Sequence, residues 1–213
     1  MRHALRRVLG RLRRRRQIER YLREHTERKL QLGAADKVLS GWLNTDLHDY
    51  GRRDVVYLDA RRRFPIPDEA FDLVYSEHML EHLSYADGQR CLGECFRVLR
   101  PRGTIRIATP SLEHLAQLYD GGELRDRYVR WAAETLEPEL HAALPGAVIN
   151  NFFHSWGHAF IYDPQTLRHA LEQAGFVDVE ERAVGKLERH LAEEPHFNEY
   201  ETFVLEARRP PAP

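Results

Sequence analysis

The stretch Lys29–Leu47, KLQLGAADKVLSGWLNTDL, constrains the fold most, because it fits a strand, a tight turn and a second strand. Leu30 and Leu32 alternate with polar neighbours, as in a strand with one buried face. Gly33-Ala34-Ala35 follows at once, and a backbone that bends sharply to approach a ligand needs such small residues. Asp46 ends the second strand, where a carboxylate can accept hydrogen bonds from a ribose diol. An ordinary turn in any α/β protein would explain the same residues.

Further apolar runs predict more strands, separated by helices or short loops. Asp54–Ala60 ends in Asp59, Phe71–Ser76 follows, and a helix that ends near Leu99 precedes Thr104–Thr109. This alternation favours an α/β fold with a mostly parallel sheet and a ligand at the carboxyl ends of the strands. A late pair of alternating strands should complete the sheet with an antiparallel edge strand. That pair is Phe176–Glu181 and Glu201–Ala207.

The segment between the last parallel strand and the late pair is expected to cover the ligand. Ser111–Tyr119 and Leu124–Glu137 have helical patterns, Pro138–Asn151 reads as irregular, and Asn151–Tyr162 is rich in aromatic residues. Pro164–Ala174 predicts another helix, closed by a glycine. We therefore expect a domain over residues 29–207 with a substrate lid at 119–162, a head at 1–28 and a tail at 208–213.

The head is basic, although the chain of 213 residues has a net charge of only -1. Met1–Lys29 contains 12 Arg or Lys and 3 Glu, whereas the rest contains 20 basic and 30 acidic residues. Apolar residues at helical spacing predict an amphipathic helix over Met1–Glu27. We expect it to pack on the domain and cover an entrance to the ligand site. A membrane-surface or protein contact stays open, whereas the Arg13–Arg16 run lacks interleaved aromatic residues and we expect no nucleic-acid partner.

The cysteines and the apolar runs limit the class of protein. Cys91 and Cys95 lie one helical turn apart, which suits neither a disulfide nor a zinc site, so we expect buried thiols in a reducing compartment. No apolar run is long enough to span a bilayer, and the head has no apolar core like that of a secretory signal. We therefore expect a cytoplasmic protein.

Four segments together resemble the class I S-adenosylmethionine-dependent methyltransferases, in particular a bacterial branch of predicted, type 11-like methyltransferases. They are Lys29–Asp46 with its GWLN-D run, PIPDEAFDLVYSEHMLEHL, ECFRVLRPRGTIRIATP and GHAFIYDPQTLRHALEQAGFVDV. The resemblance covers residues 29–207. It implies a Rossmann-like fold, a seven-stranded sheet with helices on both faces, and S-adenosylmethionine bound across the ends of the first two strands.

The resemblance also assigns cofactor-binding residues. The methionine and ribose side would contact Gly33, Ala34 and Ala35, and the ribose hydroxyls would contact Asp46 with Leu47. The adenine would lie beside Asp59 and Ala60, and the methionine end beside Ser76 and Glu77. Two features depart from the family. Ala35 replaces the usual second glycine, and the link between the first two strands is short, so its helix must be stunted.

Methyl transfer makes modest demands on the protein, because the sulfonium already carries an activated methyl group. The chain must align the acceptor, exclude water and, for a hydroxyl acceptor, provide a base with a pKa near neutrality. Histidine fits that task. Our candidate catalytic residues are His158 in the WGH turn, then His154, and His78 and Glu77 at the end of the fourth strand. For each histidine, a local hydrogen bond that holds a loop is the alternative.

A metal site is an alternative use of these residues, because His78, Glu81 and His82 lie within about one helical turn, with His154 or His158 as a further ligand. Related sequences without a metal carry the same Glu-His pair to pack a helix, and we assign no metal. The sequence therefore predicts a methyltransferase that uses S-adenosylmethionine to O-methylate a saccharide or another small hydroxyl compound. The alternatives are an inactive scaffold with a methyltransferase fold, or an RNA methyltransferase.

Overall fold

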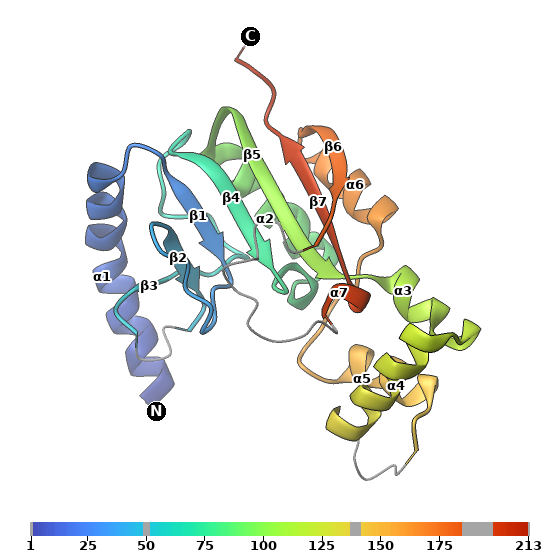
Figure 1. Ribbon diagram of the computed structural model, residues 1–213. Helices are drawn as coiled ribbons and strands as arrows, with labels where there is room; N and C mark the ends of the chain where they lie inside the picture. The colour runs from blue at the N-terminus through green and yellow to red at the C-terminus, as the bar shows by residue number, and fades with distance from the viewer. Residues whose placement is uncertain (1, 49–51, 137–141, 185–197, 213) are drawn as a thin grey trace.

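A seven-stranded sheet forms the centre of the molecule, with the strand order β3-β2-β1-β4-β5-β7-β6 (Figure 1). The computed structural model describes residues 2–48, 52–136, 142–184 and 198–212. The strands are β1 (Lys29–Leu32), β2 (Leu43–Asp46), β3 (Val55–Tyr57), β4 (Phe71–Glu77), β5 (Leu99–Pro110), β6 (Val177–Arg182) and β7 (Thr202–Arg208). The expected seven-stranded α/β fold is thus confirmed.

The first five strands are parallel, so their carboxyl ends meet at one edge of the sheet. β7 supplies the antiparallel pairing, with β5 on one side and β6 on the other. The antiparallel strand therefore lies one place in from the outermost strand, β6. Leu30, Val74 and Ile105 are almost fully buried in the central strands, as a parallel sheet with a covered face requires.

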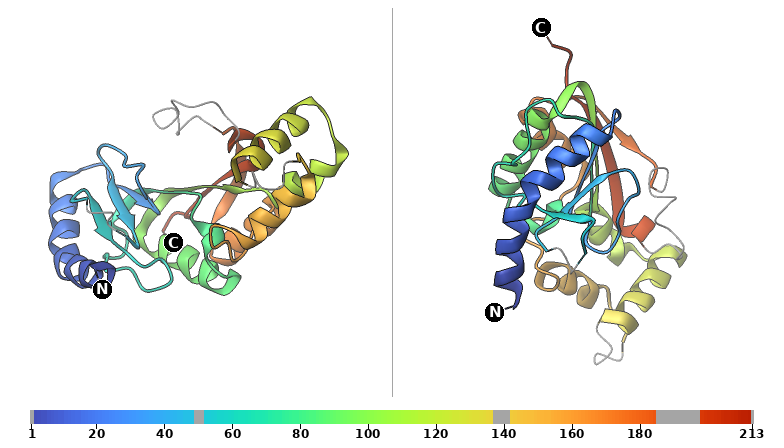
Figure 2. Two further views of the ribbon diagram at one scale, coloured as in Figure 1. Left: turned by 90° about the horizontal axis from the view of Figure 1, so that it is seen from below. Right: turned by 90° about the vertical axis from the view of Figure 1, so that its left-hand side faces the viewer.

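Two helices, Tyr85–Val98 and Pro164–Gln173, lie on the same face of the sheet (Figure 2). α2 (Tyr85–Val98) begins at Ser84, whose side chain accepts a hydrogen bond from the backbone N–H of Asp87. α6 (Pro164–Gln173) begins at Asp163 in the same way. Both cysteines are buried in the core on α2, as free thiols. The link between β1 and β2 contains no helix, which is the extreme form of the stunted helix expected there.

The basic head forms α1 (Arg2–Glu24), which packs against β3 at the edge of the sheet (Figure 1). Ile18 and Tyr21 are buried in the core. The Tyr21 hydroxyl accepts a hydrogen bond from the backbone N–H of Lys29 at 2.9 Å and lies 3.1 Å from the carbonyl oxygen of Gly41. No helix in the described part of the chain is long and apolar enough to cross a membrane.

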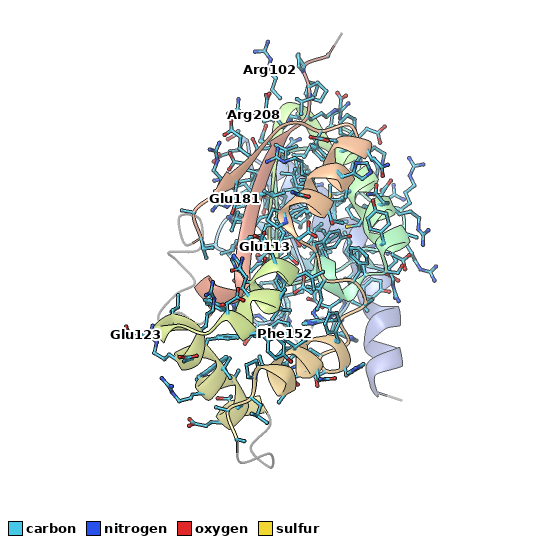
Figure 3. The ribbon with its side chains drawn as sticks, turned by 90° about the vertical axis from the view of Figure 1, so that its right-hand side faces the viewer. Arg102, Glu113, Glu123, Phe152, Glu181 and Arg208 are labelled. Atoms are coloured by element: carbon cyan, nitrogen blue, oxygen red, sulfur yellow. The ribbon has the colours of Figure 1, made fainter. Side chains whose placement is uncertain are left out.

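A group of helices extends beyond the carboxyl end of β5, and we call it the helical lid (Figure 1). It consists of α3 (Leu112–Ala116), η2 (Gln117–Asp120), α4 (Glu123–Leu136) and α5 (Pro145–His154). Glu113, Glu123 and Phe152 mark α3, α4 and α5 in Figure 3. α5 corrects the expectation of an irregular Pro138–Asn151: Pro145 opens the helix, where its missing N–H is harmless.

The lid has its own apolar core, separate from that of the sheet. This core contains Leu115, Leu118, Tyr128, Val129, Ala132, Val148, Phe152 and Ile161. The buried Tyr128 hydroxyl on α4 donates a hydrogen bond to Glu201, which ends the short helix α7 (Asn198–Glu201) directly before β7. This bond attaches the lid to the sheet.

Candidate active site

A cavity of about 420 Å³ lies at the carboxyl ends of β1 to β4. This volume is within the range of small-molecule sites. Seven of the predicted site residues line it: Gly33, Ala35, Asp46, Leu47, Asp59, Ala60 and His78. None of the α1 side chains that the structure describes, residues 13–24, lines the cavity, and the expected cover over an entrance to the site stays a prediction.

The turn after β1 brings the backbone close to this cavity. Gly33 has φ +69°, and a Cβ atom there would lie 2.4 Å from Cγ of Met79, so only glycine fits. Ala35 has φ +45°, in the left-handed region, although it carries a side chain. Two hydrogen bonds hold the turn: the Ala34 N–H donates to the carbonyl of Thr45, and the Ala35 N–H donates to Asp46 Oδ2, both at 3.0 Å.

Asp46 is oriented by two backbone N–H groups. Oδ2 accepts from Ala35, and Oδ1 accepts from the N–H of His48 at 2.7 Å. Each carboxylate oxygen has a further lone pair. Because Asp46 also lines the cavity, it can accept hydrogen bonds from a pair of hydroxyl groups on a bound molecule.

Asp59, after β3, is paired with arginines. Arg61 Nε donates to Oδ1 at 2.9 Å, and Arg62 Nε lies 3.3 Å from Oδ2. Burial by itself would raise the pKa of Asp59, but the hydrogen bonds and charge of Arg61 outweigh burial and the pKa is lowered. Asp59 is therefore ionised, and its neighbour Ala60 lines the cavity with it.

The other end of the cavity contains histidines. His78 and His82 line it together with Met79 and the half-exposed Trp156. His78 has φ +45°, and its Nε2 lies 2.8 Å from the hydroxyl of Thr202. Burial lowers the pKa of His78 to about 4, with a smaller contribution from Lys37, so the ring is neutral at pH 7.

Next to these side chains, Glu81 is fully buried and His158 is half-buried. Thr109 donates a hydrogen bond to Glu81 Oε2 at 3.0 Å, and burial raises the pKa of Glu81 to about 8. His158 Nδ1 lies 2.8 Å from the backbone carbonyl of Phe152, and burial lowers its pKa. The rings of His82 and His158 stack edge to face, with their centroids 5.0 Å apart. We call His78, Glu81, His82 and His158 the histidine cluster.

Five predicted site residues do not line the cavity: Ala34, Ser76, Glu77, His154 and His158. Ala34 and Ser76 are buried, and Glu77 accepts a hydrogen bond from Tyr75 and lies 3.5 Å from Nζ of Lys37. His154 is exposed at the end of α5. Conversely, the prediction missed Met79, His82, Arg61 and Trp156 as cavity residues. The SEHMLEHL and WGH segments contain three of these residues, but the sequence does not show which of their side chains face the cavity.

Comparisons with known proteins agree with this geometry. A sequence profile of the methyltransferase domain matches residues 18–107. A probable S-adenosylmethionine-dependent methyltransferase of Mycolicibacterium smegmatis is 34% identical over 74 residues, which is 30% of this chain. The match spans only 28% of the length of that relative.

Two solved structures share the fold. One is a methyltransferase from Archaeoglobus fulgidus, with 18% identity, a TM-score of 0.51 and 92% of each chain covered. The other is a possible histamine N-methyltransferase from Thermotoga maritima, with 16% identity, a TM-score of 0.52, and 98% of this chain and all of the other covered. In sequence the chain is thus similar to a methyltransferase domain and to a probable S-adenosylmethionine-dependent methyltransferase, and in structure it shares the fold of the two solved methyltransferases.

Proposed function

We propose that this protein transfers a methyl group from S-adenosylmethionine to a hydroxyl group of a small molecule, with saccharides as the first class to test. One observation carries the proposal: a single cavity is lined by an anchored carboxylate, Asp46, at one end and by His78 and His82 of the histidine cluster at the other. The first arrangement suits a nucleoside, and the second suits an acceptor that must lose a proton.

In this proposal the cofactor lies along the carboxyl ends of the strands. Asp46 accepts hydrogen bonds from the ribose hydroxyls, and Asp59 and Ala60 lie beside the adenine. Gly33 allows the backbone to approach the methionine portion. The methyl group would then lie toward Met79, His78 and His82, which also line the cavity.

The reaction is a displacement at the methyl carbon. The acceptor oxygen forms a bond to that carbon while the carbon–sulfur bond breaks, and the sulfur keeps the electron pair. The hydroxyl proton passes to a neutral imidazole. His158 suits this role because Nδ1 must carry its hydrogen to donate to the carbonyl of Phe152, which leaves a lone pair on Nε2.

A saccharide acceptor is supported by the mixed character of this end of the cavity. Trp156 is 50% exposed and offers a flat apolar surface, and the histidines beside it offer hydrogen-bonding groups. A sugar ring presents the same combination of an apolar face and polar edges. Small, densely hydroxylated molecules therefore fit this surface better than an apolar amine.

The cofactor part is tested by isothermal titration calorimetry with S-adenosylhomocysteine, the demethylated product. We expect one site in the wild type and at least tenfold weaker binding in Asp46→Ala, because two hydrogen bonds to a charged group are lost. Asp54→Ala is the matched control, since Asp54 is an exposed aspartate that does not line the cavity. Wild-type protein that does not bind the product would contradict the proposal.

The acceptor part is tested by transfer of a labelled methyl group to panels of saccharides, phenols, amines and RNA. We expect label in the saccharides, and we expect His158→Ala to lower turnover by roughly 10²- to 10⁴-fold while S-adenosylhomocysteine still binds. Label that appears only in amines or RNA would replace the hydroxyl assignment but leave the cofactor assignment intact.

A further inference from the structure

The histidine cluster contains three side chains with metal-ligating atoms close together. One ligand atom each from Glu81, His82 and His158 lies within 4.8 Å of the other two. Glu81 and His82 come from the turn η1 (Leu80–His82), whereas His158 comes from the segment between α5 and α6. Such a juxtaposition of residues distant in the chain needs specific tertiary contacts to hold it.

The backbone provides those contacts. The N–H groups of Ala159 and Phe160 both donate to the carbonyl of Glu81, at 2.8 and 3.1 Å. The segment that contains His158 is thereby attached to the turn that contains Glu81 and His82. The relative positions of the three side chains are therefore set by main-chain hydrogen bonds and not only by their rotamers.

Each buried ligand is also oriented by an outer hydrogen bond. His158 Nδ1 lies 2.8 Å from the carbonyl of Phe152, which fixes the tautomer with a lone pair on Nε2. Thr109 donates to Glu81 Oε2, while Glu81 Oε1 is buried and has no hydrogen-bond partner in the described part of the chain. His78 Nδ1 lies 3.6 Å from Oε1. Second-shell hydrogen bonds of this kind are typical of histidine and carboxylate metal ligands.

We propose that Glu81, His82 and His158 bind a divalent transition-metal ion of the zinc class. Two imidazoles and one carboxylate are the donors of many catalytic zinc sites, which leave a fourth position open. Magnesium and calcium prefer oxygen ligands alone, so this set does not suit them. The sequence alone did not support this site, because the position of His158 next to Glu81 depends on the fold.

One of the three proposed ligands also lines the cavity. His82 lines the cofactor cavity, so a water or an acceptor hydroxyl in that cavity can reach the ion. This role rests on the proposed function, whereas metal binding itself does not. If the ion were bound, His158 Nε2 would be a ligand and not the base, and the ion would lower the pKa of the acceptor hydroxyl, which would release its proton to solvent before methylation.

The test is a titration of chelator-treated, full-length protein with Co²⁺, followed by visible absorption, and with Zn²⁺ as competitor. We expect one tightly bound ion per chain, displaced by Zn²⁺ and not by Mg²⁺. Glu81→Gln, His82→Asn and His158→Asn should each weaken binding at least tenfold. His154→Asn is the matched control, because this exposed histidine is not part of the cluster and binding should not change.

Wild-type protein that binds no Co²⁺, or variants that bind it as tightly as the wild type, would overturn the proposal. Because Glu81 is buried, the Glu81→Gln result is interpreted only if circular dichroism shows a folded chain. If this variant does not fold, His82→Asn tests the proposal, because His82 is exposed. S-adenosylhomocysteine binding is measured on the same samples. Wild-type protein that binds S-adenosylhomocysteine but no Co²⁺ contradicts the metal site alone, and wild-type protein that binds Co²⁺ but no S-adenosylhomocysteine contradicts the proposed function alone.

Discussion

The two ends of the cavity differ in how they are assembled and in the charge state they favour. At the end where we propose that the cofactor binds, which we call the cofactor end, Gly33, Ala35 and Asp46 come from one strand–turn–strand unit. At the other end, the histidine cluster joins residues 78–82 to His158 across the chain. The arginines beside Asp59 lower its pKa, whereas burial raises the pKa of Glu81.

This difference indicates which kind of change should disturb each end of the cavity. The cofactor end depends on backbone geometry, so a single added methyl group should disturb it. The other end depends on the docking of the helical lid and on buried ionisable groups, so pH and changes of charge should affect it more. The predictions below test this contrast.

The largest effect is expected from Gly33→Ala. The new Cβ would lie 2.4 and 2.5 Å from Cγ and Cβ of Met79, and φ is +69°. Because the Met79 Cβ cannot move without its backbone, we expect S-adenosylhomocysteine binding to weaken at least 100-fold and the free energy of unfolding to fall by about 3 kcal/mol. Calorimetry and urea unfolding measure the two quantities.

Gly93→Ala is the control for this substitution. Gly93 lies within α2, and no other heavy atom is found within 4 Å of an added Cβ. Alanine there should raise the free energy of unfolding by up to about 1 kcal/mol through helix propensity and leave binding unchanged. If Gly33→Ala bound the product as the wild type does, the close approach at this turn would not matter for the cofactor.

The fold was the more predictable part, because its signals are local. Alternating and β-branched runs predict β1, β4 and β5, and the helix expected over Pro164–Ala174 is α6. α5 lies within the segment Pro138–Asn151, which contains Pro145 and was expected to be irregular. Proline at the first position of a helix removes only an N–H that has no partner there anyway.

The site was less predictable, because the direction of a side chain depends on the finished fold. Residues after β4 were expected near the methyl group, yet Ser76 is buried away from the cavity while His78 and His82 line it. Nothing local in the sequence brings the carbonyl of Glu81 to the N–H groups of Ala159 and Phe160. Whether the cavity residues bind the cofactor stays a prediction.

A smaller effect, specific to the lid, is expected from Glu201. Burial raises the pKa of this carboxyl to about 7, against the opposing effect of the Tyr128 hydrogen bond. The folded protein therefore keeps a proton that the unfolded chain releases near its ordinary pKa of 4.5. Between these values the unfolded state binds fewer protons, so the free energy of unfolding falls as the pH rises, by roughly 3 kcal/mol at most.

Urea unfolding of the wild type and Glu201→Gln from about pH 4.5 to pH 8 measures this contribution as the difference between the two curves. We expect the curves to converge at the acidic end and the wild type to become the less stable of the two as the pH rises. Glu123→Gln, an exposed lid residue, controls for the loss of one carboxylate. Parallel curves for the wild type and Glu201→Gln would show that the ionisation of Glu201 does not make the free energy of unfolding depend on pH.

The smallest effect is expected from Ala35→Gly at the cofactor end. Ala35 has φ +45°, a backbone conformation that costs a residue with a side chain about 1–2 kcal/mol relative to glycine. A glycine lowers the free energy of unfolding by roughly 0.5–1 kcal/mol, because its unfolded chain has more conformational entropy. The net gain in the free energy of unfolding should be up to about 1 kcal/mol, or a rise in Tm of roughly 2–4 °C. Differential scanning calorimetry detects such a shift.

Ala34→Gly next to it supplies the opposite case. Ala34 is buried and does not have a positive φ, so glycine there should lower the free energy of unfolding by about 1 kcal/mol. Opposite signs at adjacent alanines would show that strain in the turn is local to position 35 and is held by the hydrogen bonds to Thr45 and Asp46. If both variants were destabilised alike, the left-handed backbone at Ala35 would carry no cost, and the departure from glycine at this position would not limit cofactor binding.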